Sequence, residues 1–206
     1  MLYDGTLPVE KRDDGEYEFE LKDVSFSYPG TDQRALDHIS LKFTVGKHYA
    51  LVGQNGSGKS TLIALLCRLY EPAEGQILLN GIPIGLYDYQ EYTDIFSVVF
   101  QDYHLFAAPV SENVAGGSEV DPERLRKSLA EAEVYETFHD ITKGKTAVYI
   151  SHRMSSCRFC DEILVLDHGK LCERGTHQQL MERQGIYAKL YETQAEYYRE
   201  ERQQFG

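Results

Sequence analysis

The chain has 206 residues, enough for one large domain or for a core domain with a smaller appendage. Hydrophobic residues make up 42% of it and charged residues 26%, which is typical of a folded protein and argues against wholesale disorder. The formal net charge of −12, without any concentrated run of lysine and arginine, argues against a nucleic-acid-binding surface, so we expect no nucleic-acid partner.

Cysteine usage and hydropathy narrow the class of protein further. The four cysteines are dispersed rather than spaced as a disulfide scaffold, which suits a reducing compartment. Cys157 and Cys160 form a C-x-x-C without a second pair of ligands, so the pattern is weak evidence for zinc or redox chemistry. No apolar stretch is long enough to cross a membrane and no signal peptide is visible, so we expect a soluble segment.

The first third of the chain reads as a polar lead-in followed by strands. Residues 1–16 contain turn-forming residues and little apolar pattern, so we expect folded structure to begin near Tyr17. Polar and apolar residues then alternate at 17–21, 24–28 and 39–45, which predicts half-buried antiparallel strands. A continuous apolar run at 48–52 predicts a short, fully buried strand.

A phosphate-binding pattern follows that buried strand. It reads Gly53-Gln54-Asn55-Gly56-Ser57-Gly58-Lys59-Ser60-Thr61 and fits G-x-x-x-x-G-K-[ST]. The glycines let backbone N–H groups turn toward phosphate oxygens, Lys59 supplies a charge to the terminal phosphates, and Ser60 offers a hydroxyl to Mg²⁺. We predict a nucleoside triphosphate site at the positive end of a helix whose apolar stripe runs from Leu62 to Leu69.

The remaining elements follow in chain order. Apolar runs predict strands at 76–81, at 95–100 leading into Gln101, at 147–150 and at 162–167. The order Asp121-Pro122-Glu123 is typical of a helix start. Thr176 and Gln179 have the spacing of a capping box, and a last helix is predicted from about 186 to 202.

Four separated features together resemble the nucleotide-binding domain of ATP-binding cassette (ABC) transporters, most closely that of exporters. Beside the phosphate loop, they are Tyr28 in Phe26-Ser27-Tyr28-Pro29-Gly30, Gln101 after Val98-Val99-Phe100, His152 in Ile150-Ser151-His152-Arg153, and the run from Asp167 to His177. Taken alone, Tyr28 would be a surface tyrosine and His152 a strand-end histidine. The resemblance implies that Tyr28 stacks on adenine, that Gln101 binds Mg²⁺, and that His152 contacts the γ-phosphate.

The resemblance also implies a fold and partners. The fold would be α/β, with a P-loop NTPase core of mostly parallel strands flanked by helices, an antiparallel β subdomain, and a truncated or missing helical subdomain. Residues 1–16 would be a linker after a membrane domain, and 17–206 the nucleotide-binding domain. The implied ligands are ATP and Mg²⁺. The implied partners are a transmembrane domain and a second nucleotide-binding domain, head to tail, at the cytoplasmic face of the membrane.

This sequence departs from the family between Gln101 and His152. The LSGGQ-like signature, the Walker B strand with its Asp, the catalytic Glu and the D-loop do not occur there, and the join falls near 129–134. Asp167 follows an apolar strand but lies after His152, so we assign it to a strand-end turn. Because loss of a Walker B strand beside the phosphate-loop strand would leave two buried edges unpaired, we favour an omitted stretch over a natural product of this length.

Three functions stay open from these residues. The first is an ATPase domain that powers substrate export, with Lys59, Gln101 and His152 as its catalytic residues; the printed chain would then be weak or inactive. The second is a soluble ABC-type ATPase without transport. The third is an ATP-binding module without catalysis, because the catalytic Glu and the signature are missing.

Overall fold

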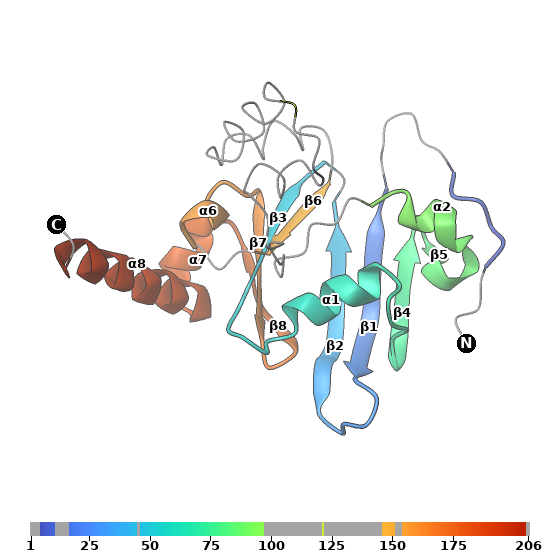
Figure 1. The fold of residues 1–206 in the computed structure, drawn as a ribbon, viewed down its shortest axis with the longest axis horizontal. Helices are drawn as coiled ribbons and strands as arrows, with labels where there is room; N and C mark the ends of the chain where they lie inside the picture. The colour runs from blue at the N-terminus through green and yellow to red at the C-terminus, as the bar shows by residue number, and fades with distance from the viewer. Residues whose placement is uncertain are drawn as a thin grey trace. The chain divides into compact units, whose positions relative to one another are not determined.

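Two four-stranded sheets organise the chain in the computed structural model, which describes residues 5–10, 17–44, 46–96, 121, 146–150 and 154–204 (Figure 1). At 155–156 and 197–204 the description covers the backbone alone. Apart from Asp121, the described residues belong to one unit, formed by the chain before residue 97 and after residue 143. Asp121 is described, but the rest of the helix predicted to start there and the join predicted near 129–134 lie outside the described residues.

The first sheet is antiparallel, with the strand order β2-β1-β4-β5. Its strands are β1 (Phe19–Ser27), β2 (Arg34–Phe43), β4 (Glu74–Leu79) and β5 (Ile82–Pro83). Along β2, buried apolar residues alternate with exposed polar ones from Ile39 onward, as in antiparallel sheets with one solvated face. The sequence pattern therefore located this sheet but missed β5.

Two bulges explain where the predicted strands of this sheet differ from the observed ones. The segments predicted at 17–21 and 24–28 form the single strand β1, because one extra residue is absorbed between Leu21 and Val24. Asp23 has a φ of 52° there. The strand predicted at 39–45 begins earlier, at Arg34, and His38, with a φ of 54°, interrupts the alternation that would have revealed its first half.

The second sheet is mostly parallel, with the strand order β6-β3-β7-β8. Its strands are β3 (His48–Val52), β6 (Ala147–Ile150), β7 (Glu162–Asp167) and β8 (Lys170–Gly175). β3 runs parallel to both β6 and β7, and β8 returns antiparallel to β7. The predicted strands at 48–52, 147–150 and 162–167 are confirmed to the residue, and Asp167 ends β7 as expected.

The phosphate-loop strand β3 has a neighbour on each side. Leu51 lies opposite Ile150 of β6 and opposite Leu164 of β7. The expectation that the missing Walker B segment would leave the edge of this strand unpaired is therefore wrong. The reason is that β6 and β7, both from after residue 143, supply the backbone partners of β3, so that among the described strands β6 rather than β3 lies at the edge of the sheet.

Both faces of the parallel sheet are covered. On one face Tyr49 and Leu51 join a large hydrophobic cluster that includes the antiparallel sheet and α1 (Lys59–Leu66). On the other face Ala50 and Val52 join a second cluster with α6 (Met154–Cys157), α7 (His177–Arg183) and α8 (Ile186–Gln204). This two-sided burial explains the continuous apolar run of β3.

The helices follow their local signals in part. Thr176 and Gln179 form the predicted capping box at the start of α7, and α8 begins at Ile186 as predicted. The first helix ends earlier than its apolar stripe suggested, at Leu66, because Arg68 takes a left-handed conformation with a φ of 56°. Leu69 is consequently 49% exposed rather than part of the core stripe.

The segment after β4 differs from the prediction. It forms β5, a 3₁₀ turn (η1, Ile84–Leu86) and the short helix α2 (Tyr89–Thr93). The predicted strand at 95–100 is wrong at its first two residues, which follow α2 as a turn, and its remainder lies outside the described residues. Contacts also begin before Tyr17, because the backbone N–H of Val9 donates to Glu91 at 2.8 Å.

Candidate nucleotide-binding site

The phosphate loop, residues 53–61, joins the carboxyl end of β3 to the start of α1 (Figure 1). Gly56 and Gly58 have φ values of 78° and 103°, which side chains other than glycine rarely adopt. The N–H of Ser57 donates to the carbonyl of Gln54 at 3.1 Å and closes the turn. Asn55 and Gly56 are exposed while Ser57 is buried, so the loop presents its middle to solvent.

The N-terminus of α1 is open to an anion. Gly58 is its N-cap, no side chain caps the helix, and its first turn holds no acidic residue. The first helical hydrogen bond at this end runs from the N–H of Leu62 to the carbonyl of Gly58 at 2.9 Å. The preceding N–H groups have no acceptor in the helical ladder, and they carry the positive end of the helix dipole. Such an end binds phosphate without further charge.

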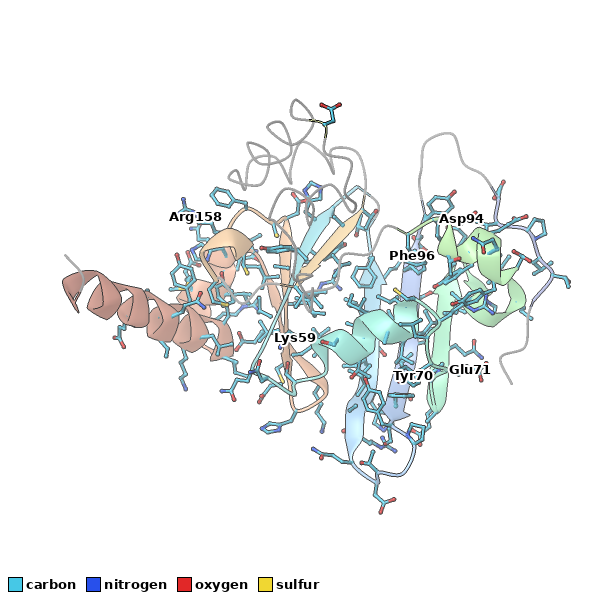
Figure 2. All side chains as sticks on the ribbon, in the orientation of Figure 1. Lys59, Tyr70, Glu71, Asp94, Phe96 and Arg158 are labelled. Atoms are coloured by element: carbon cyan, nitrogen blue, oxygen red, sulfur yellow. The ribbon has the colours of Figure 1, made fainter. Side chains whose placement is uncertain are left out.

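Lys59 crosses the loop and is only 7% exposed (Figure 2). Its ammonium donates to the carbonyls of Gly53 at 2.9 Å and of Gln54 at 2.8 Å, and to the hydroxyl of Ser57 at 3.3 Å. Burial disfavours the charged form and lowers the pKa of Lys59 from its ordinary value of 10.5. A phosphate beside it would restore the preference for the charged form.

The two hydroxyl residues after Lys59 have different surroundings. Ser60 is exposed on the first turn of α1, and Thr61 is buried. Mg²⁺ keeps several waters and binds nucleotides through one or two protein oxygens and phosphate oxygens, so a single exposed serine hydroxyl fits this role. The residues present therefore fit a magnesium–nucleotide complex.

Tyr28 lies against the start of α1, where its hydroxyl is hydrogen-bonded to the hydroxyl of Thr61 at 3.1 Å. Its ring makes edge-to-face contacts with Phe26, at 5.1 Å between centroids, and with Tyr70, at 5.3 Å. Tyr28 is 36% exposed, so these contacts orient the ring while part of it stays in solvent. The structure thus brings the predicted aromatic residue to the phosphate loop.

Tyr70 was missed by the sequence analysis and lies in the same aromatic group (Figure 2). It lies four residues after the end of α1 at Leu66 and is 39% exposed. Its only signal in the sequence is an aromatic residue just beyond a helix, and such residues are common on surfaces. The contact with Tyr28 depends on the antiparallel sheet and α1 packing together, which no local pattern specifies.

The other two predicted site residues, Gln101 and His152, lie outside the described residues. The strand before His152 is described, however. β6 is parallel to β3 and in register with it, with Ile150 opposite Leu51. The chain therefore leaves β6, two residues before His152, at the same edge of the sheet where the phosphate loop leaves β3.

Comparison with known proteins decides the family. Residues 36–157, which are more than half of the chain, match the family described as ABC transporter. The chain belongs to the ABC transporter family. The stretch that matches includes the phosphate loop, and the predicted membership is confirmed.

Several relatives are bacterial transporters. An ATP-dependent lipid A-core flippase of Mannheimia succiniciproducens is 32% identical over 257 residues, covering 91% of this chain and 44% of the relative. A flippase of the same description from Haemophilus influenzae is 31% identical over 253 residues, covering 89% and 43%. The chain thus spans less than half the length of these relatives.

A solved structure gives the same fold. A bacterial Atm1-family ABC exporter with ATP bound has a TM-score of 0.75 and 25% identity, over 93% of this chain and 44% of that chain. This likeness and the two sheets confirm the predicted fold class, an α/β P-loop core with an antiparallel β subdomain. Among the described helices, none is long and apolar enough to cross a membrane.

Changing Tyr28 should separate stacking from hydrogen bonding. Tyr28→Ala removes the ring, and base–aromatic stacking contributes about 1–3 kcal/mol, so we expect the Kd for ATP to rise roughly ten- to hundredfold. Tyr28→Phe keeps the ring and loses only the bond to Thr61, so its Kd should change by less than about fivefold. Calorimetric titration of both variants measures this. Equal losses in the two variants would contradict a stacking role.

The buried ammonium of Lys59 predicts an alkaline decline in nucleotide affinity. In the free protein burial lowers the pKa of Lys59 below 10.5, and bound phosphates raise it, so binding takes up a proton above the free pKa. Affinity for ATP should therefore be highest below the free pKa of Lys59 and fall as the pH rises through that pKa toward 10.5. Lys59→Arg keeps its charge throughout this range and should flatten the decline, as measured by titration at each pH. A decline of the same slope in both proteins would contradict this assignment.

Proposed function

We propose that this chain binds ATP together with Mg²⁺ at the phosphate loop and is the nucleotide-binding domain that powers export in an ABC transporter. The observation that carries the proposal is the arrangement at the start of α1, an uncapped helix N-terminus beside a glycine loop and the buried ammonium of Lys59. A cation and converging N–H groups at one place fit the chemistry of a polyphosphate.

Each described site residue has a distinct task in this proposal. The ring of Tyr28 stacks on the adenine, which tolerates any base edge because every base has a π face. Lys59 moves from its carbonyl acceptors to the terminal phosphates, and Ser60 gives one oxygen to Mg²⁺, which neutralises charge on the phosphates. The backbone of Gly53, Asn55, Gly56, Ser57 and Gly58 surrounds the phosphates, and Thr61 holds Tyr28 in place.

Gln101 and His152 complete the proposed site. The amide oxygen of Gln101 is a suitable ligand for Mg²⁺, and its loop would report the state of the nucleotide to a neighbouring domain. The imidazole of His152 would hold the γ-phosphate and help to position the attacking water, acting by hydrogen bonding and charge. The parallel register of β6 with β3 supports this placement of His152.

The partners are proposed from the length of the relatives. Since the chain spans 44% of the flippase from M. succiniciproducens, we assign the rest of the transporter to a transmembrane domain, in the same polypeptide and N-terminal to this chain. Residues 1–16 would be the linker between them. Two nucleotide-binding domains would face each other head to tail at the cytoplasmic face of the membrane, closing on ATP and opening after hydrolysis.

The alignment lengths support an internal gap, which we propose lies near 129–134. The alignment with the M. succiniciproducens flippase has 257 positions and takes in 91% of 206 residues, or about 187, which leaves roughly 70 positions without a residue of this chain. The H. influenzae alignment, with 253 positions and 89%, or about 183 residues, leaves a similar number. A gap of this size fits a missing signature, Walker B strand and catalytic Glu.

This gap separates binding from hydrolysis. Binding depends on Tyr28 and the phosphate loop, which are described and complete. Hydrolysis also needs a group that orients or deprotonates the attacking water, and general base catalysis of this kind contributes roughly 10²–10⁴-fold. We therefore propose that the chain as printed binds ATP and hydrolyses it weakly or not at all, whereas the intact transporter is an ATPase.

Titration with ATP and Mg²⁺ tests the proposed binding. Lys59→Ala removes a charge-assisted contact with the phosphates, and we expect the Kd to rise at least about tenfold. Lys47→Ala is the matched control, because it removes an exposed lysine just before β3, at the strand end opposite the phosphate loop. It should leave the Kd unchanged. Absence of saturable binding by the unaltered chain would refute the proposal.

Phosphate release tests the proposed loss of hydrolysis. We expect the unaltered chain to release phosphate at least about 100-fold more slowly than a chimera that carries, at 129–134, the corresponding segment of the M. succiniciproducens flippase. His152→Ala in the chimera should abolish the gain, because the γ-phosphate loses its contact. Rapid, His152-dependent release by the unaltered chain would show that the missing segment is not needed.

A further inference from the structure

The turn between β7 and β8 touches the phosphate loop from behind. Asp167 and Lys170 pair directly, so His168 and Gly169 form a two-residue hairpin turn. Both have positive φ values, 45° and 77°, as such turns require. Figure 1 shows this turn beside the trace that joins β3 to α1. The turn contains no group that the proposed chemistry uses.

Gly169 connects the phosphate loop to the antiparallel sheet through its own backbone. Its N–H donates to the carbonyl of Ser57 at 3.1 Å, and its carbonyl accepts from the N–H of Asp37 in β2 at 2.9 Å. A single residue of the turn thus holds a carbonyl of the loop on one side and a strand on the other. These bonds link three segments that are far apart in the sequence.

The three segments approach one another closely, with backbone at each contact and the side chain of Leu36 2.7 Å from the Cβ position of Gly58. A Cβ on Gly169 would lie 2.9 Å from the carbonyl oxygen of Ala35, and a Cβ on Gly58 would lie 2.7 Å from the same oxygen. A Cβ on Gly53 would lie 2.2 Å from the carbonyl oxygen of Leu166, at the end of β7. The phosphate loop therefore rests on backbone at both its beginning and its end.

Side-chain charges add little to this contact. The ammonium of Lys170 lies 3.2 Å from the carboxylate of Asp37, which also pairs with Arg34 at 2.7 Å. Lys170 and Arg34 are well exposed, and exposed ion pairs contribute little to stability. The backbone bonds and the close packing, rather than the ion pairs, hold the loop in place.

The bond to Ser57 sets the direction of a phosphate-binding N–H. In a trans peptide the C=O and the N–H point in opposite directions. The carbonyl of Ser57 and the N–H of Gly58 belong to one peptide unit, so holding the carbonyl toward Gly169 directs the N–H of Gly58 away from the turn. Gly58 is the N-cap of α1, where an anion would bind.

We propose that Gly169 is a positioning residue for nucleotide binding, because it fixes the peptide between Ser57 and Gly58 with its N–H directed at the phosphates. This inference rests on the proposed binding of ATP at the phosphate loop. It assigns a task to the turn between β7 and β8. That turn affects the binding of the phosphates and not that of the base.

Gly169→Ala tests the proposal. The new Cβ must displace Ala35 or move the turn, and a displaced Ser57 carbonyl misdirects the N–H of Gly58. We expect the Kd for ATP to rise roughly tenfold. Gly81→Ala is the matched control, because Gly81 has a φ of 81° with nothing within 4 Å of its Cβ position. It carries the same backbone strain without touching the loop and should bind ATP normally.

Tripolyphosphate separates an effect on the phosphates from an effect on the base, and the Gly81→Ala control reports any general loss of structure. It has the phosphates of ATP without the base, so Gly169→Ala should weaken the binding of tripolyphosphate and of ATP by the same factor. Tyr28→Ala should weaken the binding of ATP and leave that of tripolyphosphate unchanged. If Gly169→Ala folds and binds both ligands as tightly as Gly81→Ala does, the proposal is wrong.

Hydrogen exchange on the unaltered chain gives an answer even where Gly169→Ala fails to fold. ATP should slow exchange at the amides of Gly169 and Asp37, together with that of Gly58, since one bonded series connects them. Protection of Gly58 with no change at Gly169 and Asp37 would overturn the positioning role while leaving the proposed function intact. If the unaltered chain does not bind ATP, the proposed function and this inference fail together.

Discussion

The parallel pairing of β3 with β6 and β7 is the constraint on which the site depends. β3 is buried on both faces and bonded along both edges, so its carboxyl end is held in one place. The chain must turn sharply there to enter α1, and only glycine provides the backbone angles without strain. A loop anchored in this way can present N–H groups to a ligand without having to order itself on binding.

The loop is also electrostatically prepared. The uncapped N-terminus of α1 leaves positive partial charge at one point, and Lys59 lies across the loop with its ammonium bonded to the carbonyls of Gly53 and Gln54. Those carbonyls are weaker partners than a phosphate oxygen, because bonds between two ionised groups are stronger. The same side chain can therefore stabilise the empty loop and still favour the nucleotide. The backbone of the β7–β8 turn contacts the loop at Ser57, while the exposed middle of the loop at Asn55 and Gly56 faces solvent.

The proposed function places binding and catalysis in different parts of this chain. The binding elements are local, within residues 28–61, and the structure brings them together through the packing of α1 against the antiparallel sheet. The proposed catalytic residues, Gln101 and His152, flank the stretch in which we propose the gap. Such a gap would leave β3 paired, since its neighbours β6 and β7 come from residues after 143. A folded nucleotide-binding core is therefore compatible with a deficient catalytic centre.

The sequence by itself determined the phosphate loop, the bounds of β3, β6 and β7, and the capping box at Thr176, because each is specified by residues within a few positions of one another. Only the tertiary structure decided the order of the parallel strands, the first half of β2, the end of α1 at Leu66, and the contacts of Tyr70 and Gly169. Those features depend on which distant segments pair or pack, and bulges at Asp23 and His38 disguise the local pattern. Backbone bonds between remote segments, such as that from Gly169 to Ser57, involve no side chain and so leave little trace in the sequence beyond a glycine.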